Sequence, residues 1–262
     1  MTRVLLRMLG GIVLAGALML SASPAHATPK ATPKAKQYVC EGGVIPAGSY
    51  KSVVVAGACA VAPNAKINVK GDVKVLAGAM LDAHSAPSTI VVGGNVLGAK
   101  GSFVALGCQS PAHTGNSAHE CASDPNGASK ITVKGSITLD RPIAVMLNGL
   151  KVNGSITVLG GGSDIPWSIK NNKVRGNVVV IGSTTWWIGV LFNDIRGSVA
   201  LHDITITDQD GELERTFVVR NKIRKYLSCT DMPEGVFGYG NTIKRAGLGL
   251  CADPALTGDA PW

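Results

Sequence analysis

Val152-Asn153-Gly154-Ser155-Ile156-Thr157-Val158 and, one repeat later, Val174-Arg175-Gly176-Asn177-Val178-Val179-Val180 share the pattern Val/Ile-x-Gly-x-Val/Ile-x-apolar. Further copies begin at Val69, Val133 and Ile195, and weaker ones begin at Val92, Ile223 and Ile243. Most successive starts lie roughly 21 residues apart, and the interval from Val92 to Val133 is close to two such periods. Apolar and polar residues alternate within each copy, which predicts a strand with one buried face.

Strands that recur without helices between them exclude a Rossmann-type sheet and an α/β barrel, because both need helical crossovers. No amphipathic helical pattern of useful length appears after residue 37. We therefore predict an all-β fold, a single-stranded parallel β-helix, in which about ten coils wind into a solenoid between Tyr38 and Ala252. Equivalent residues of neighbouring coils then stack roughly 4.8 Å apart.

Three columns of residues follow from this register. The first inward column is Val69, Val92, Val133, Val152, Val174, Ile195, Ile223 and Ile243, and the second is Val73, Val96, Ile137, Ile156, Val178, Val199 and Leu227. Asparagines form the third column, at Asn172, Asn193, Asn221 and Asn241, each two residues before a member of the first. Stacked asparagines can pass amide hydrogen bonds from coil to coil.

With this asparagine column, the chain resembles the right-handed parallel β-helix proteins of the pectin-lyase-like superfamily. It resembles the uncharacterised bacterial secreted β-helix proteins more closely. The resemblance covers roughly residues 50 to 245. It implies a right-handed coil and is specific for fold, not for chemistry.

Composition and charge narrow the classes of function. The 262 residues include 33 Gly, 13 Pro and four each of Trp, Tyr and Phe, which is typical neither of a disordered polyelectrolyte nor of a helical bundle. The formal net charge of +8 falls to +6 without Arg3 and Arg7, and to about +3 without the three lysines between residues 28 and 37. So mild a charge does not indicate nucleic-acid binding.

The first residues have the features of an export signal. Arg3 and Arg7 precede an apolar stretch from Leu9 to Leu20, and Ala25-His26-Ala27 provides small residues for cleavage. We predict a signal peptide at residues 1–27, a basic Thr-Pro-Lys linker at 28–37, a β-helix domain at 38–252 and a C-terminal tail at 253–262. The apolar stretch is too short to span a bilayer. The expected location is secreted, extracellular or associated with the cell surface, without a transmembrane segment.

Six cysteines in an exported chain favour three disulfides, and fifteen connectivities are formally possible. Neighbours in sequence make compact pairs, so we predict disulfide staples between Cys40 and Cys59, Cys108 and Cys121, and Cys229 and Cys251. Cysteines one coil apart would have their Cα atoms within the distance that a disulfide accepts. The last pair fits if Gly247-Leu248-Gly249 absorbs a slip of two residues.

A column of cations follows the first inward column. The residues directly after its members are Lys70, Gly93, Lys134, Asn153, Arg175, Arg196, Arg224 and Lys244. Alternation places them outside the coil, although like charges on paired strands are destabilising. The six cations predict a track for a linear polyanion, since Arg and Lys donate to carboxylates and phosphates. A solvated face that keeps apolar coils apart is the alternative.

Two further groups carry weaker hypotheses. Trp186 and Trp187 are adjacent, so in a strand one of the two indoles faces outward and can stack on a sugar; a buried tryptophan beside one that covers a turn is the alternative. Cys108, His113, His119 and Cys121 have a composition that holds zinc in other proteins, but export favours a disulfide. We predict no metal ligands.

The acidic run from Asp208 to Arg215 falls in the lengthened interval between Ile195 and Ile223 and contains Asp-x-Asp-Gly, which can wrap calcium but lacks the full calcium-loop pattern. If calcium binds there, the resemblance implies, for a pectate-lyase-like enzyme, that Asp203, Asp208 and Asp210 polarise a uronate while Arg215 or Arg220 removes a proton. A solvated acidic loop is the alternative.

These residues predict a secreted monomer that binds an anionic polysaccharide or cell-wall polymer without turnover, and that needs no cofactor. A polysaccharide lyase or glycoside hydrolase acting on acidic glycans is the second hypothesis. A purely structural cell-surface protein is the third.

Overall fold

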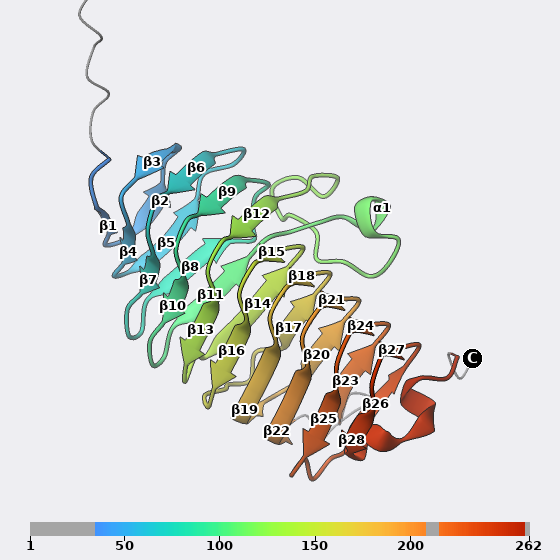
Figure 1. The fold of residues 1–262 in the computed structure, drawn as a ribbon. Coiled ribbons are helices and arrows are strands. Elements are labelled where there is room, and N and C mark those ends of the chain that lie inside the picture. Colours follow the sequence, from blue (N-terminus) through green and yellow to red (C-terminus); the bar gives the residue numbers. More distant parts are fainter. Residues whose placement is uncertain (1–34, 208–214, 260–262) are drawn as a thin grey trace, which may run out of the picture. The chain divides into compact units, whose positions relative to one another are not determined.

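The computed structural model describes residues 35–207 and 215–259, and nearly all of the regular structure in them is β-strand. The strands form three sheets, and each strand pairs in parallel with the equivalent strand of every coil next to it. Figure 1 shows the strands of each sheet stacked along the unit formed by residues 35–262. The fold is thus all-β and solenoid-like, as the repeat predicts.

The sheets are named here in the order in which the chain enters them. The first sheet contains β1 (Tyr38–Cys40), β4 (Val53–Val55), β7 (Val73–Val75), β10 (Val96–Gly98), β13 (Ile137–Asp140), β16 (Ile156–Leu159), β19 (Val178–Thr185), β22 (Val199–Ile206), β25 (Leu227–Thr230) and β28 (Gly247–Gly249). The second contains β2 (Gly43–Ile45), β5 (Ala58–Val61), β8 (Met80–Ala83), β11 (Phe103–Leu106), β14 (Ala144–Asn148), β17 (Trp167–Lys170), β20 (Ile188–Leu191), β23 (Thr216–Val219) and β26 (Val236–Tyr239). The third contains β3 (Gly48–Tyr50), β6 (Lys66–Val69), β9 (Thr89–Val92), β12 (Lys130–Val133), β15 (Lys151–Val152), β18 (Lys173–Val174), β21 (Asp194–Ile195), β24 (Lys222–Ile223) and β27 (Thr242–Ile243). The short helices are α1 (Pro111–Thr114), η1 (Leu250–Ala252) and η2 (Pro254–Leu256).

Both predicted apolar columns are confirmed, residue by residue, in the strand pairing. In the third sheet Val152 pairs with Val174 and Val174 with Ile195, and the remaining members of the column continue in the same register. In the first sheet the second column is equally continuous from Val73 to Leu227. Most of these side chains are fully buried, and each contributes about 1.5–3 kcal/mol on burial, so the two columns form much of the core.

The asparagine column is also confirmed. Asn172 Nδ2 donates to Asn193 Oδ1 at 3.1 Å, Asn193 to Asn221 at 2.9 Å and Asn221 to Asn241 at 3.0 Å. Each Oδ1 also accepts the backbone N–H of the preceding asparagine in the column, as in the 2.9 Å bond from Asn172 N. These side chains therefore satisfy buried backbone at the bend before the third sheet.

One prediction about the repeat is wrong. Val92 pairs directly with Val133, so the long interval between them belongs to neighbouring coils and contains no missing coil. The extra residues leave the coil after β11 and form a loop closed by the disulfide between Cys108 and Cys121. A solenoid tolerates such an insertion because it leaves the stacking of the coil itself unchanged.

The three predicted disulfides are confirmed as the pairs Cys40–Cys59, Cys108–Cys121 and Cys229–Cys251. Gly249 pairs with Cys229, and the chain then makes the short helix η1, which carries Cys251 back over the last coil. The described tail covers the end of the stack, because Asn241 N donates to Leu256 O and the Leu256 side chain is buried. Among the described residues, no helix has the length and apolar character that crossing a membrane requires.

Candidate polyanion-binding face

The cations predicted to face outward lie directly after the strands of the third sheet. Arg175, Arg196, Arg224 and Lys244 are exposed, and each donates its backbone N–H to the inward residue of the preceding coil, as in the 2.9 Å bond from Arg196 N to Val174 O. Lys70 and Lys134 occupy the same position in earlier coils, also exposed. The repeating backbone hydrogen bonds therefore hold these residues in one line, which we call the cation ladder.

The ladder is longer than the sequence pattern predicts. Tyr50 pairs with Val69, which places the exposed Lys51 in register with Lys70. Lys225 and Arg245 form an additional step beside the last two coils, linked by a 3.2 Å hydrogen bond from Arg245 N to Lys225 O. The repeat pattern did not include Lys51, because the preceding Tyr50 is not an aliphatic residue. The adjacent cations at 224–225 and 244–245, by contrast, could have been recognised in the sequence as an additional step.

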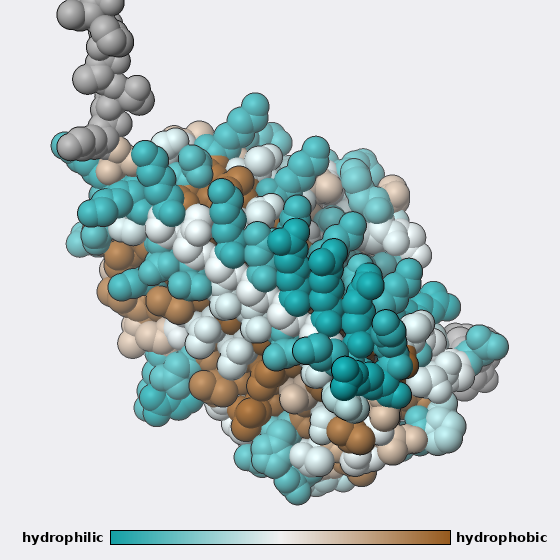
Figure 2. Space-filling view, in the orientation of Figure 1, coloured by the Kyte–Doolittle hydropathy of each residue, from teal (hydrophilic) through white to brown (hydrophobic). Residues whose placement is uncertain are grey.

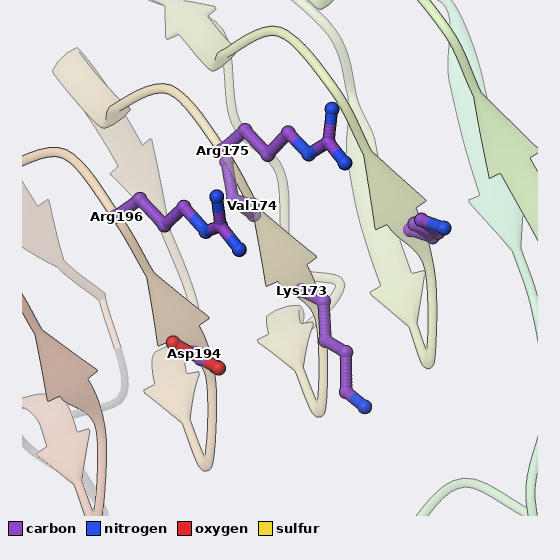
Figure 3. A pocket seen from close by; sticks show the side chains of 6 residues that line it. Lys173, Val174, Arg175, Asp194 and Arg196 are labelled. Carbon is purple, nitrogen blue, oxygen red and sulfur yellow. The ribbon is translucent and has the colours of Figure 1, made fainter.

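A second row of cations lies beside the ladder. Lys151 and Lys173 are exposed partners in neighbouring strands of the third sheet, one residue before the inward valines. With Arg175, Arg196 and Asp194 they line a surface hollow of about 520 Å³, open solvent included. Figure 3 shows the guanidinium groups of Arg175 and Arg196 extending in the same direction from adjacent strands. The hollow thus combines four cations with one carboxylate.

A second hollow lies beside the first and reaches the two ends of the loop that follows β11. It has a volume of about 640 Å³, open solvent included, shares Lys151 and Lys173, and adds Lys130, Gln109 and other residues. In Figure 2 the most hydrophilic residues gather in a diagonal band over β15, β18, β21, β24 and β27. A basic surface therefore runs along the third sheet from β12 to β27, with at least one cation in every coil.

Acidic groups neutralise little of this surface. Asp194 Oδ1 lies 4.0 Å from Arg224 Nη2, and the two side chains are 43% and 60% exposed, so this ion pair adds little to stability. Within residues 35–207 and 215–259, the other ion pairs of arginine and histidine lie elsewhere, at Arg141 with Asp140 and at His202 with Asp231. The positive charges of the ladder can therefore attract an anionic ligand.

A column of small and polar residues keeps the coils close beside the ladder. The glycines that follow it hydrogen-bond in series, as in the 3.0 Å bond from Gly197 N to Gly176 O. Next to them Ser198 N donates to Asn177 Oδ1 at 2.8 Å, and Asn177 N donates to Ser155 Oγ at 3.0 Å. A Cβ atom on Gly197 would overlap Asn177 and the Gly176 backbone, so glycine is required there. This second polar column was present in the Gly-x-Val/Ile pattern but was not predicted.

The paired tryptophans do not follow the alternation of a strand. Trp186 and Trp187 lie in the bend between β19 and β20, where both indoles are at least partly exposed. Trp187 contacts Phe217 with a ring-centre distance of 5.7 Å, whereas Trp167, in β17, is fully buried. Sugar stacking by Trp186 and Trp187 stays a prediction.

The structure describes only part of the proposed lyase site. Asp203 is exposed at the bend inside β22, with φ of +52°, whereas Arg215 lines a separate hollow with Phe237 and Asp253. Asp208 and Asp210, and with them the proposed calcium loop, lie outside the described residues. The neighbouring coil places Asp231 beside His202, with a 3.1 Å distance from Asp231 Oδ2 to His202 Nδ1. The catalytic hypothesis therefore stays a prediction.

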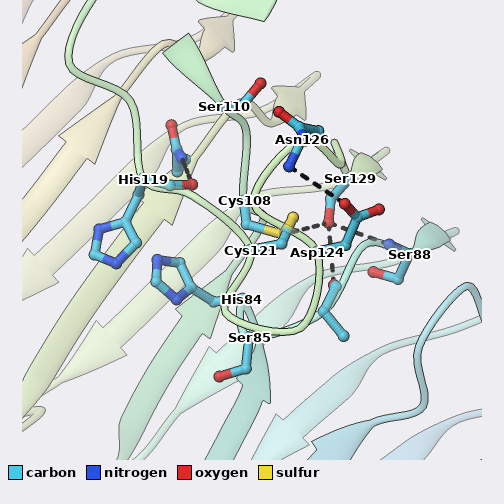
Figure 4. The surroundings of a disulfide bond; sticks show 12 residues. His84, Ser85, Ser88, Cys108, Ser110, His119, Cys121, Asp124, Asn126 and Ser129 are labelled. Atoms are coloured by element: carbon cyan, nitrogen blue, oxygen red, sulfur yellow. Dashed lines mark hydrogen bonds between the residues drawn. A yellow bond between two sulfur atoms is a disulfide. The ribbon is translucent and has the colours of Figure 1, made fainter. Parts of the chain in front are cut away.

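The loop closed by Cys108 and Cys121 packs on the second sheet (Figure 4). The His119 ring contacts the His84 ring, with centres 3.8 Å apart and planes tilted by 59°, and Lys170 Nζ donates to Ser117 O at 2.8 Å. Burial, followed by the nearby His119, lowers the pKa of His84 to about 4, although Asp82 opposes the shift. Burial also lowers the pKa of His119 and of Lys170. Because the two sulfurs bond to each other, they are not available to zinc.

No family model matches this chain, and no curated protein and no solved structure matches it either.

Proposed function

We propose that the protein binds a linear anionic polymer, a polysaccharide or a cell-wall polymer, along the cation ladder and does not turn it over. The observation that carries this proposal is the line of Arg175, Arg196, Arg224 and Lys244 on successive coils, exposed and almost unpaired by acids. Stacked like charges oppose folding. A bound polyanion removes this repulsion by placing negative charge between the cations.

The regular spacing of the ladder favours a polymer over a small anion. Neighbouring rungs are about 4.8 Å apart, so one extended chain can meet cations on several coils without bending. Arginine suits this contact because its planar fork binds carboxylates and phosphates through two hydrogen bonds. Several weak contacts along one chain add up to useful affinity.

The same proposal includes the setting of the protein. It is an exported β-helix of about ten right-handed coils, related to the pectin-lyase-like superfamily and acting outside the cell or at its surface. Parallel strands joined by a crossover are right-handed in nearly all proteins, which supports the hand. Three disulfides support an oxidising compartment.

A pair of matched charge reversals tests the proposal. Polygalacturonate and a glycerol-phosphate polymer are immobilised, and binding of the chain from residue 28 is measured at two salt concentrations. We expect steep loss of binding with salt, and at least about tenfold weaker binding in the variant Arg175→Glu/Arg196→Glu. The control Lys74→Glu/Lys100→Glu makes the same charge change at exposed lysines off the ladder. Equal losses in both variants, or unchanged binding in the first, would refute the proposal.

The same polymers separate binding from catalysis. The products are assayed for unsaturated uronate and for new reducing ends, with and without calcium. We expect neither. Turnover that disappears in Asp208→Asn/Asp210→Asn would favour the lyase or hydrolase and contradict binding without turnover.

A further inference from the structure

The loop at residues 107–129 brings three basic side chains together from separate segments. His84 directly follows β8, His119 belongs to the loop, and Lys170 ends β17. The ring centres of His84 and His119 are 3.8 Å apart, and Lys170 Nζ donates to Ser117 O at 2.8 Å. Figure 4 shows the two imidazoles side by side. The cluster therefore lies where the loop meets the second sheet.

Polar contacts hold the loop on the coils around this cluster. Asn148 Nδ2 donates to His119 O at 3.3 Å. The side chains of Asn116 and Asn171 bond to each other through two hydrogen bonds of 2.8 and 3.3 Å. None of the ion pairs among residues 35–207 and 215–259 joins the loop to a coil. Docking of the loop therefore depends on amide hydrogen bonds, the contact from Lys170 and the packing of the two imidazole rings.

The described residues provide little negative charge to compensate a proton in this cluster. Asp82, in β8, is the carboxylate nearest in sequence to His84, and its two oxygens accept from His84 N, Ser85 N and Ser85 Oγ at 2.9, 2.9 and 2.6 Å. Glu120, which follows His119, is exposed to solvent. A proton on either imidazole thus adds positive charge beside another basic side chain.

The pKa values agree with this geometry. Burial lowers the pKa of His84 to about 4, and His119 adds to the shift while Asp82 opposes it. Burial, followed by the charge of Lys170, lowers the pKa of His119, and burial lowers the pKa of Lys170. All three shifts favour the uncharged form. A histidine in water has a pKa of 6.5, so below that pH the docked protein binds fewer protons than one whose loop has moved away.

We propose that the loop at residues 107–129 is a pH-sensitive switch, docked on the second sheet near neutral pH and released in acid. Protonation of His84 and His119 drives the release, because the two charged rings regain water and move away from each other and from Lys170. Release needs no ligand, so it can be tested without the polymer proposed for the ladder.

The movement leaves the solenoid intact. The coils on either side of the loop pair directly through Val92 and Val133. The disulfide between Cys108 and Cys121 keeps the released loop closed on itself. Gln109, near the start of the loop, lines the second basic hollow. Release therefore changes one border of that hollow while the coils stay stacked.

Hydrogen exchange followed by mass spectrometry tests the switch on the chain from residue 28 with its disulfides intact. Exchange of the amides of residues 109–127 is compared with that of β20 in the same molecule at about pH 7, 5.5 and 4, which corrects for the effect of pH on chemical exchange. We expect the loop amides to lose protection in acid while β20 keeps it. Titration of His84 from 6.5 to about 4 can raise the opening equilibrium by up to about 300-fold.

Two double variants remove the titrating groups. They are His84→Gln/His119→Gln and His84→Phe/His119→Phe, of which the second keeps two aromatic rings in contact. Protection of the loop should no longer depend on pH in them. His113→Gln is the matched control, since His113 lies in the same loop, is exposed and bonds through Nδ1 to Ser110 Oγ at 2.9 Å, so acid release should persist.

Three results would overturn the proposal. The first is equal protection of the loop at pH 7 and pH 4 in the unmodified protein. The second is acid release that persists in both double variants or disappears in His113→Gln. The third is a loop already open at pH 7 in both double variants, because uncharged side chains should leave it docked.

Discussion

Removal of one cation from the ladder should make the protein more stable. The substitution is Arg196→Gln, in which glutamine keeps the polar character and loses the charge. Arg196 has Arg175 and Arg224 in register on the two adjacent coils. No ion pair or side-chain hydrogen bond involves Arg196 in residues 35–207 and 215–259. The change therefore removes repulsion without removing a bond.

The size of the effect follows from the spacing of the coils. Two unit charges about 4.8 Å apart in water repel by about 0.9 kcal/mol, so the two neighbours contribute about 1.7 kcal/mol. Asp194, two residues earlier and about 6.6 Å away along the strand, attracts Arg196 by about 0.6 kcal/mol. Arg196→Gln should thus raise the free energy of unfolding by about 1 kcal/mol at low salt.

Urea unfolding checks this value, because urea is uncharged and does not screen the ladder. The gain should be largest at about 10 mM salt, where the Debye length is about 30 Å, and nearly absent at about 1 M, where it is about 3 Å. Lys134→Gln is the control, since Gly93 and Asn153, its column neighbours, are uncharged. If Arg196→Gln is destabilising, or matches Lys134→Gln at both salt concentrations, the repulsion argument is wrong.

Three further substitutions test the interior. Asn193→Ala removes four buried hydrogen bonds, including the 2.8 Å bond to Ile169 O. It should lower the free energy of unfolding, measured in urea, by roughly 3 kcal/mol or more. A loss below about 1 kcal/mol would contradict the stabilising role of the asparagine column. Gly197→Ala should lower the melting temperature because its Cβ meets the preceding coil, whereas Gly258→Ala, with no atom closer than 3.6 Å, should not; equal effects would count against close stacking. The pKa of His84 falls from 6.5 to about 4 on folding, so between these pH values the unfolded chain binds a proton that the folded protein does not. His84 therefore leaves the free energy of unfolding independent of pH above pH 6.5 and lowers it by roughly 3 kcal/mol as the pH falls from 6.5 to about 4. In His84→Gln, the urea midpoint of unfolding should change less with pH over that range. If the midpoint changes with pH as steeply as in the unmodified protein, His84 is not the cause.

The third sheet was the most predictable part of the fold. Its inward residues stand at a fixed distance before a glycine, so the register of Val152, Val174 and Ile195 could be read from the pattern alone. The second sheet was less visible, because bends of different length precede its strands and residues such as Trp167 and Thr216 replace aliphatics. Periodicity identifies the most regular side of a coil and not its variable corners.

The candidate sites divide in the same way. The ladder was predictable because each rung occupies one place in the repeat. The hollow beside β26 was not, since Arg215, Phe237 and Asp253 share no pattern and meet only through the return of the tail. Contacts between His84 and His119 were hidden for a similar reason, as a loop inserted within one coil brings the two rings together.

The ladder lies between two hydrogen-bonded columns, so the residues that hold the coils together differ from the residues proposed to bind the ligand. Asparagines such as Asn193 lie before the third-sheet strand, and Asn177 and the glycines lie after the ladder residue, so each bend is held from both sides. The cationic side chains then project from a backbone whose spacing they do not maintain. It follows that Arg196→Gln and Asn193→Ala, only three residues apart, must change stability in opposite directions. Destabilisation by both would mean that the arginines help to hold the coils together, and the reason for assigning them to a ligand would be lost.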